Sequence, residues 1–265
     1  MTPLAVALPT AASDFLLTLV IGLFWIYVPF CFILVTRYVL RQNRQGRLIN
    51  TENAPLPLAV SGLSGAVFAV FVLALIFLQS PLFVILVPIG ALGVLMETGR
   101  SATEQFGLAR LRPVRLMSWS LLVFGAVMLV IEPLAGIVAL LFDVLHLPNP
   151  EQETVIAFRH FNRASQILDF AFEAVLLSPM IEELFFRGFL LGFLKRYTST
   201  WMALLLSSGV FAFAHANLGA ALPLWFLGLA LGLAYEHTGS LLLPMGIHAC
   251  WNFVTALSLL LEKGN

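Results

Sequence analysis

The last third of the chain places a small set of ionisable and amide side chains inside long apolar stretches. These side chains belong to Glu182, Glu183, Arg187, His215, His248 and Asn252. Charge is costly at bilayer depth, so an ionisable residue there indicates a functional site with a nearby partner. A carboxylate and an imidazole can move protons, and imidazole or amide N–H groups can stabilise a developing oxyanion. Together, these residue types could hydrolyse a peptide bond.

The two adjacent glutamates are expected to have different roles. Glu183 and Arg187 are four residues apart, so in a helix they share one face and can form an ion pair. Arginine suits this position because its planar fork binds a carboxylate and stays charged when buried. Glu182 points ~100° away around the helix, so we predict that it faces a cavity as a general base. A buried structural ion network is the favoured interpretation of Glu183 and Arg187, and it is the alternative interpretation of Glu182.

The histidines and the asparagine lie on two later apolar stretches. Glu182 lies before Lys195 and His215 lies after Trp201, each about 20 Å from the predicted cytoplasmic end of its helix at ~1.5 Å per residue. We therefore predict that they are partners. His248 and Asn252 are four residues apart and share one helix face. Both can donate hydrogen bonds to an oxyanion. Their alternative role is to hold neighbouring helices together through polar contacts.

Metal-ion catalysis is the competing chemistry. Two histidines and a carboxylate could hold zinc with one open position. The chain lacks the His-Glu-x-x-His pattern that makes zinc binding specific, and activation of water without a metal fits the residues at least as well. We therefore expect no cofactor and keep zinc as the alternative. A serine nucleophile is disfavoured because Ser178 and Ser240 have no evident paired base.

The composition predicts an integral membrane protein. Of the 265 residues, 60% are hydrophobic and 11% are charged, whereas a soluble domain has about 25% charged residues. The mean hydropathy is +0.97. The formal net charge is zero, which gives no general case for binding nucleic acid. Because the apolar stretches have the ~20-residue length of spanning helices, we predict an all-α, polytopic membrane helix bundle.

We predict about eight transmembrane helices from these stretches. They cover residues 14–36, 56–78, 81–96, 116–144, 167–194, 201–214, 220–235 and 241–261. With this count the basic residues of three loops all fall on one side of the membrane, which we assign to the cytoplasm. We expect a single membrane domain over residues 1–265. Its N-terminal helices would cover residues 1–165, and its catalytic core would cover residues 166–261.

The combined spacing of these residues resembles a known family of membrane proteases. The motifs Glu182-Glu183-x-x-x-Arg187, Phe211-x-x-x-His215 and His248-x-x-x-Asn252 resemble those of the CAAX-processing and bacteriocin-processing (CPBP, or Abi) proteases. The likeness covers about residues 171–254. It implies a glutamate-dependent intramembrane endopeptidase in which Glu182 and His215 activate water. By the same likeness, His248 and Asn252 bind the oxyanion, and Glu183 and Arg187 are supporting residues.

The resemblance also implies the partners of the protein. The expected substrate is a membrane-associated peptide or protein, either a prenylated CAAX-like protein or a bacteriocin or leader peptide. Membrane lipid is the second expected partner, no nucleic acid is expected, and the sequence carries no signal for an oligomeric state. We expect a multi-pass protein of the plasma membrane. A transporter or proton relay and a non-enzymatic scaffold are the alternatives, because intramembrane Glu and His residues also serve transport.

Overall fold

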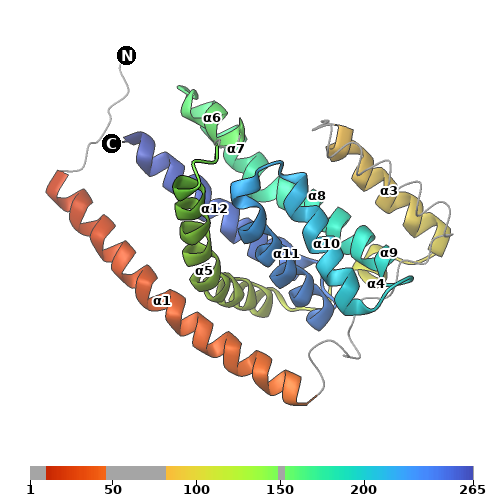
Figure 1. Ribbon diagram of the computed structural model, residues 1–265. Helices are drawn as coiled ribbons and strands as arrows, with labels where there is room; N and C mark the ends of the chain where they lie inside the picture. Colours follow the sequence, from red (N-terminus) through yellow and green to blue (C-terminus); the bar gives the residue numbers. More distant parts are fainter. Residues whose placement is uncertain (1–9, 46–81, 149–152, 265) are drawn as a thin grey trace.

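A computed structural model describes residues 10–45, 82–148 and 153–264. Within these ranges the regular secondary structure is entirely helical (Figure 1). The elements are α1 (Thr10–Arg44), α3 (Leu82–Thr98), α4 (Ala102–Phe106), α5 (Pro113–Val144), α6 (Glu153–Arg159), α7 (Ala164–Phe172), the π-helix η1 (Glu173–Leu177), α8 (Ser178–Glu183), the π-helix η2 (Leu184–Leu191), α9 (Gly192–Leu194), α10 (Thr200–Ala214), α11 (Leu218–Thr238) and α12 (Leu242–Gly264). The predicted all-α class is therefore confirmed for the described residues.

Seven of the eight predicted helices coincide with helical segments in the described ranges. The remaining one, 56–78, lies outside the described residues. Three described helices, α5, α11 and α12, are long and apolar enough to cross a membrane, while α3 and α10 are apolar but shorter. The chain is thus a membrane protein, and its eight-span count stays a prediction.

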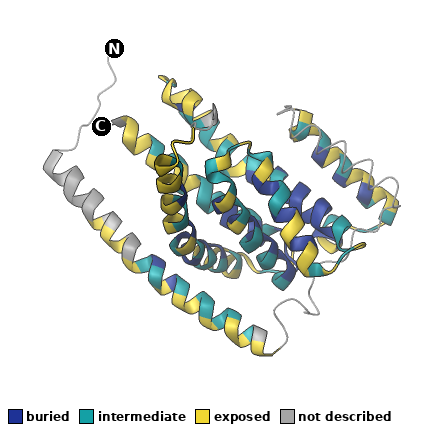
Figure 2. Cartoon of the chain, viewed as in Figure 1, coloured by how far each residue is buried: buried dark blue, intermediate teal, exposed yellow. Residues whose placement is uncertain are grey.

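Helix α5 lies between α1 on one side and α11 and α12 on the other (Figure 1). Helix α3 lies on the far side of the bundle, where it contacts α8 and η2. Buried residues concentrate in the C-terminal helices, whereas the described part of α1 is exposed along its outer face (Figure 2). The centre of the bundle is therefore formed by the elements that carry the candidate site.

The predicted helix 167–194 is not a uniform α-helix. Two π-helical segments, η1 and η2, flank the short α8 that carries the glutamate pair. Each π segment offers a backbone carbonyl to another helix: Asn252 Nδ2 donates to the oxygen of Ala174 at 2.7 Å, and Ser207 Oγ donates to that of Phe186 at 3.2 Å. Because π segments occur frequently at functional sites, this irregularity supports a functional reading of α8.

A close backbone contact joins α4 to the end of α11. Gly107 and Gly239 both have φ +64°, and a Cβ on Gly107 would overlap the carbonyl of Gly239. The backbone N–H of Leu241 donates to the oxygen of Phe106 at 3.0 Å. Only glycine combines the left-handed conformation with so close an approach, so this contact fixes the turn before α12.

Candidate active site

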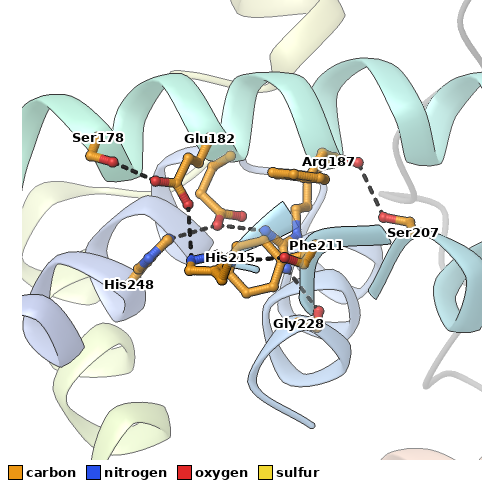
Figure 3. A network of polar contacts seen from close by, with 10 residues as sticks. Ser178, Glu182, Arg187, Ser207, Phe211, His215, Gly228 and His248 are labelled. Carbon is orange, nitrogen blue, oxygen red and sulfur yellow. Dashed lines mark hydrogen bonds and ion pairs between the residues drawn. The ribbon is translucent and has the colours of Figure 1, made fainter. Parts of the chain in front are cut away.

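Glu182 lies between a serine and a histidine. Its Oε1 accepts a hydrogen bond from the Ser178 hydroxyl, and its Oε2 lies 3.9 Å from His215 Nε2 (Figure 3). Oε2 is buried and has no hydrogen-bond partner among the described residues. The side chains of Glu182 and His215 are 18% and 24% exposed, respectively. Glu182 and His215 therefore lie close together, as predicted, and both side chains are partly exposed.

The orientation of the His215 ring is fixed by backbone groups. His215 is the C-cap of α10, and its Nδ1 lies 2.8 Å from the carbonyl oxygen of Phe211. A carbonyl oxygen can only accept, so Nδ1 carries the hydrogen, and Nε2 of the neutral ring presents a lone pair to Glu182. The chain then turns at Ala216, whose φ is 50°, and Asn217 caps α11. The tight turn between α10 and α11 thus orients His215 Nε2 towards the Glu182 carboxylate.

Glu183 belongs to a second, fully buried network. Its Oε1 accepts from Arg187 Nη1 at 2.6 Å and lies 2.9 Å from His248 Nδ1. The side chains of Glu183 and Arg187 are 0% exposed, and that of His248 is 4% exposed. The predicted Glu183–Arg187 pair is confirmed, and the structure adds His248 as its third member. The adjacent glutamates therefore have separate partners, as the helix geometry predicts.

Phe211 connects the two networks. Its ring centroid lies 4.8 Å from that of His215 and 5.7 Å from that of His248, and the Arg187 guanidinium carbon lies 4.5 Å from it. A guanidinium over an aromatic face gains cation–π attraction, which grows when the pair is desolvated. The fully buried Phe211 thus positions three polar side chains and also holds His215 through its backbone carbonyl.

Asn252 has a structural contact in this arrangement. Its bond to Ala174 ties α12 to η1 and uses one of the two N–H groups of the amide, which leaves the second able to donate elsewhere. The other five predicted site residues form the Glu182–His215 pair and the Glu183–Arg187–His248 network. The alternative interpretation of Asn252, as a residue that holds helices together, is therefore observed, and its oxyanion role stays a prediction.

Three residues of the site were not predicted from the sequence as site residues. Ser178, set aside as a nucleophile, instead donates to Glu182 from four residues away, a spacing that predicts such a contact. Phe211 was noted only as a motif position, and Gly228 carried no signal. The carbonyl of Gly228 accepts from Arg187 Nη2 at 3.0 Å, which anchors the buried guanidinium to α11.

The close approach of α10 and α11 at Gly228 predicts a large effect of a single methyl group. A Cβ there would lie 3.1 Å from the Cα and Cβ of Ser208 and 3.2 Å from a ring carbon of Phe211. We expect Gly228→Ala to lower the free energy of unfolding by about 1–3 kcal/mol through overpacking. Gly136→Ala on α5, where a Cβ meets nothing within 4 Å, is the matched control for thermal unfolding in detergent. Equal unfolding temperatures for both variants would contradict the proposed close contact.

The donor set gives little support to a zinc site. In the part of the chain that the structure describes, no three His, Cys, Asp or Glu side chains gather closely enough to hold a metal ion. The Oε1 atom of Glu183 already has Arg187 and His248 as partners. Glu182 and His215 alone would supply two ligands, whereas a catalytic zinc usually takes three from the protein.

One family of known proteins matches the chain. Residues 163–254 match the family model described as Type II CAAX prenyl endopeptidase Rce1-like. No curated protein and no solved structure matches the chain. The matched segment contains all six predicted site residues and both π segments. The match confirms the resemblance predicted from the motifs: residues 163–254 are similar to the Rce1-like type II CAAX prenyl endopeptidases.

Proposed function

We propose that the protein is an intramembrane endopeptidase that hydrolyses a peptide bond with water activated by Glu182 and His215. The observation that carries the proposal is the pair itself. Glu182 Oε2 is buried without a partner among the described residues, 3.9 Å from His215 Nε2. A carboxylate oxygen and the Nε2 of the neutral ring are both acceptors. Two acceptors that face each other favour a ligand with two donor hydrogens, which water provides.

The dimensions of the pair fit that ligand. A water oxygen about 2.8 Å from each acceptor makes ordinary hydrogen bonds to both when their separation is 3.9 Å. Its lone pairs are then free to attack a carbonyl carbon. The Ser178 hydroxyl holds Oε1 and so directs Oε2 towards His215. The site therefore provides a general base and a second acceptor within reach of a single water molecule.

The proposed reaction transfers one proton from water to the leaving nitrogen and breaks the C–N bond of the substrate. Glu182 takes a proton from water as the oxygen bonds to the carbonyl carbon of the substrate, and a tetrahedral oxyanion forms. Collapse of this intermediate breaks the C–N bond. The proton from Glu182, relayed by His215, passes to the leaving nitrogen, and the products are a carboxylic acid and an amine. General acid–base catalysis of this kind contributes about 10²–10⁴ in rate.

His248 and Asn252 are the proposed oxyanion donors. His248 Nδ1 faces the acceptor oxygen of Glu183, so its Nε2 can donate only when the ring is protonated on both nitrogens. Glu183 would stabilise such an imidazolium, much as the buried aspartate of a serine-protease triad does. Asn252 would donate through the N–H that Ala174 does not use. Glu183 and Arg187 then act as positioning residues for His248.

The description of the matched family indicates which substrate to test first. It names CAAX prenyl endopeptidases, so a prenylated C-terminal CAAX peptide is the first proposed substrate, and a bacteriocin or leader peptide is the second. We place the reaction in the plasma membrane. The test is the cleavage of both peptides, and of an unprenylated CAAX peptide, by the protein in liposomes. Cleavage of none of them, by a protein that is folded, would favour the scaffold or transporter alternative.

Chelation separates the proposed mechanism from zinc catalysis. We expect the cleavage rate to be unchanged, within about twofold, by a zinc chelator, because general-base activation by a carboxylate needs no metal ion. The purified protein should contain much less than one zinc per chain by elemental analysis. Loss of cleavage with the chelator, and its recovery on adding zinc, would replace the glutamate mechanism with a metal site.

Ser178→Ala tests how the carboxylate is held. Hydrogen bonds to charged groups contribute about 1.5–3 kcal/mol, and 1.36 kcal/mol corresponds to a tenfold change in rate. We expect kcat to fall roughly tenfold because Oε1 loses its donor. Ser207→Ala removes a comparable serine bond, to Phe186, and is the control that should retain nearly full kcat. Equal kcat values for Ser178→Ala and Ser207→Ala would contradict a role of Ser178 in the mechanism.

A further inference from the structure

A cavity of about 750 Å³ lies between α1, α5 and α11, and none of the six predicted site residues lines it. Its volume falls within the range of small-molecule binding sites, about 300–1,000 Å³. The polar and aromatic side chains that line it are those of Tyr38, Arg110, Arg115, Trp119, His237 and Thr238. The rest of the lining is apolar. The cavity is therefore amphipathic, with two arginines and a histidine among its lining residues.

A second cavity of about 310 Å³ continues the first. The two share the lining residues Val35, Val39, Val127, Ala230 and Leu233. Apart from Thr36, the second cavity is lined by apolar side chains, and it reaches Ile131. Arg115 and Ile131 are separated by about 24 Å along α5, at ~1.5 Å per residue. Together the cavities form a crevice with a cationic region and a long apolar extension.

The polar groups of the crevice lie at one end of the bundle. Arg115 lies in the first turn of α5, Tyr38 near the end of α1 and His237 near the end of α11. The Tyr38 hydroxyl lies 2.6 Å from His237 Nε2, and His237 Nδ1 is buried with no hydrogen-bond partner among the described residues. Cationic and hydrogen-bonding groups thus meet where the apolar extension begins.

We propose that this crevice binds an anionic phospholipid. Its phosphate lies beside Arg110 and Arg115, and one acyl chain follows the apolar extension between α1, α5 and α11. Charge complementarity favours the phosphate, since basic pockets between transmembrane helices bind anionic lipid headgroups. The crevice is ~24 Å long, which exceeds one half of a ~30 Å hydrocarbon core. It is therefore long enough for one acyl chain and part of a headgroup. A bound lipid would join α1 to the α5–α11 pair.

The test is native mass spectrometry of the detergent-purified full chain with added dioleoyl phosphatidylglycerol or phosphatidylcholine. Arg115→Glu is compared with Arg112→Glu, since Arg112 is the N-cap of the same helix, carries the same charge and does not line the crevice. Ala230→Phe fills the apolar extension and is compared with Ala139→Phe, which lies on the exposed surface of α5. Glycerol phosphate without acyl chains serves as a competitor.

We expect wild type to retain one phosphatidylglycerol in preference to phosphatidylcholine. Arg115→Glu and Ala230→Phe should each weaken retention by roughly tenfold or more, while both controls retain it. Glycerol phosphate should compete poorly because it lacks the chain. Equal retention of the two lipids, or equal retention by Arg115→Glu and Arg112→Glu, would overturn the proposal. Full competition by glycerol phosphate would reduce the site to a phosphate site.

Discussion

Replacing Glu183 with alanine is expected to destabilise the protein more than any other single change in the candidate site. The substitution leaves Arg187 and His248 buried without their shared carboxylate. Breaking a buried ion pair by removing one partner typically costs about 3–5 kcal/mol. We expect the free energy of unfolding to fall by that amount, which thermal unfolding in detergent would measure as a large drop in unfolding temperature.

Two further variants keep this prediction testable if Glu183→Ala does not fold. Glu183→Gln retains an acceptor oxygen for Arg187, so we expect it to unfold between wild type and the alanine variant. Glu182→Gln changes the neighbouring carboxylate, whose Oε2 has no partner among the described residues, and should unfold close to wild type. Equal unfolding temperatures for Glu182→Gln and Glu183→Gln would contradict the separate roles of the two glutamates.

Glu182 and His215 are expected to act as one catalytic unit. Because both contact the same water molecule in the proposed mechanism, removing either one removes the general-base step. We expect Glu182→Gln and His215→Ala each to lower kcat by about 10²–10⁴. The double variant should lose little more than the larger single loss, since residues that act as a unit are strongly non-additive.

The non-additivity is measured by a double-mutant cycle on kcat with one prenylated CAAX peptide. Losses that multiply in the double variant would mean that Glu182 and His215 act in independent steps. Phe213→Ala offers a matched control: this exposed residue lies on the same helix, close to His215. It should leave kcat nearly unchanged, because its side chain has no part in the proposed mechanism.

The positions of the long apolar helices in the described ranges, and two of the site contacts, could be predicted from the sequence. Helix-length apolar stretches predicted the helical segments, because a helix needs ~20 apolar residues to span a bilayer. The four-residue spacing predicted the Glu183–Arg187 pair. The similar depths of Glu182 and His215 in the predicted membrane helices predicted that these two residues lie close together. These features depend on local geometry or on distance along one helix axis, both of which the sequence carries directly.

The π segments and the partners of His248 and Asn252 could not be predicted from the sequence pattern. Hydrophobic periodicity does not distinguish an i→i+5 turn inside a mostly apolar helix, so η2 looks like a continuation of α8. The contact between His248 and Glu183 joins residues 65 positions apart. This contact depends on how closely α12 packs against α8. The spacing of residues within α12 does not predict that packing. The same reasoning applies to Asn252, whose partner Ala174 lies in η1.

The most direct test of the glutamate mechanism compares initial cleavage rates of wild type and Glu182→Gln on one prenylated CAAX peptide. Both proteins are reconstituted in the same liposomes, and thermal unfolding confirms that both are folded. We predict cleavage at one peptide bond by wild type, and a rate at least about 10² lower for the folded variant. Cleavage by folded Glu182→Gln at the wild-type rate would contradict the assignment of Glu182 as the general base.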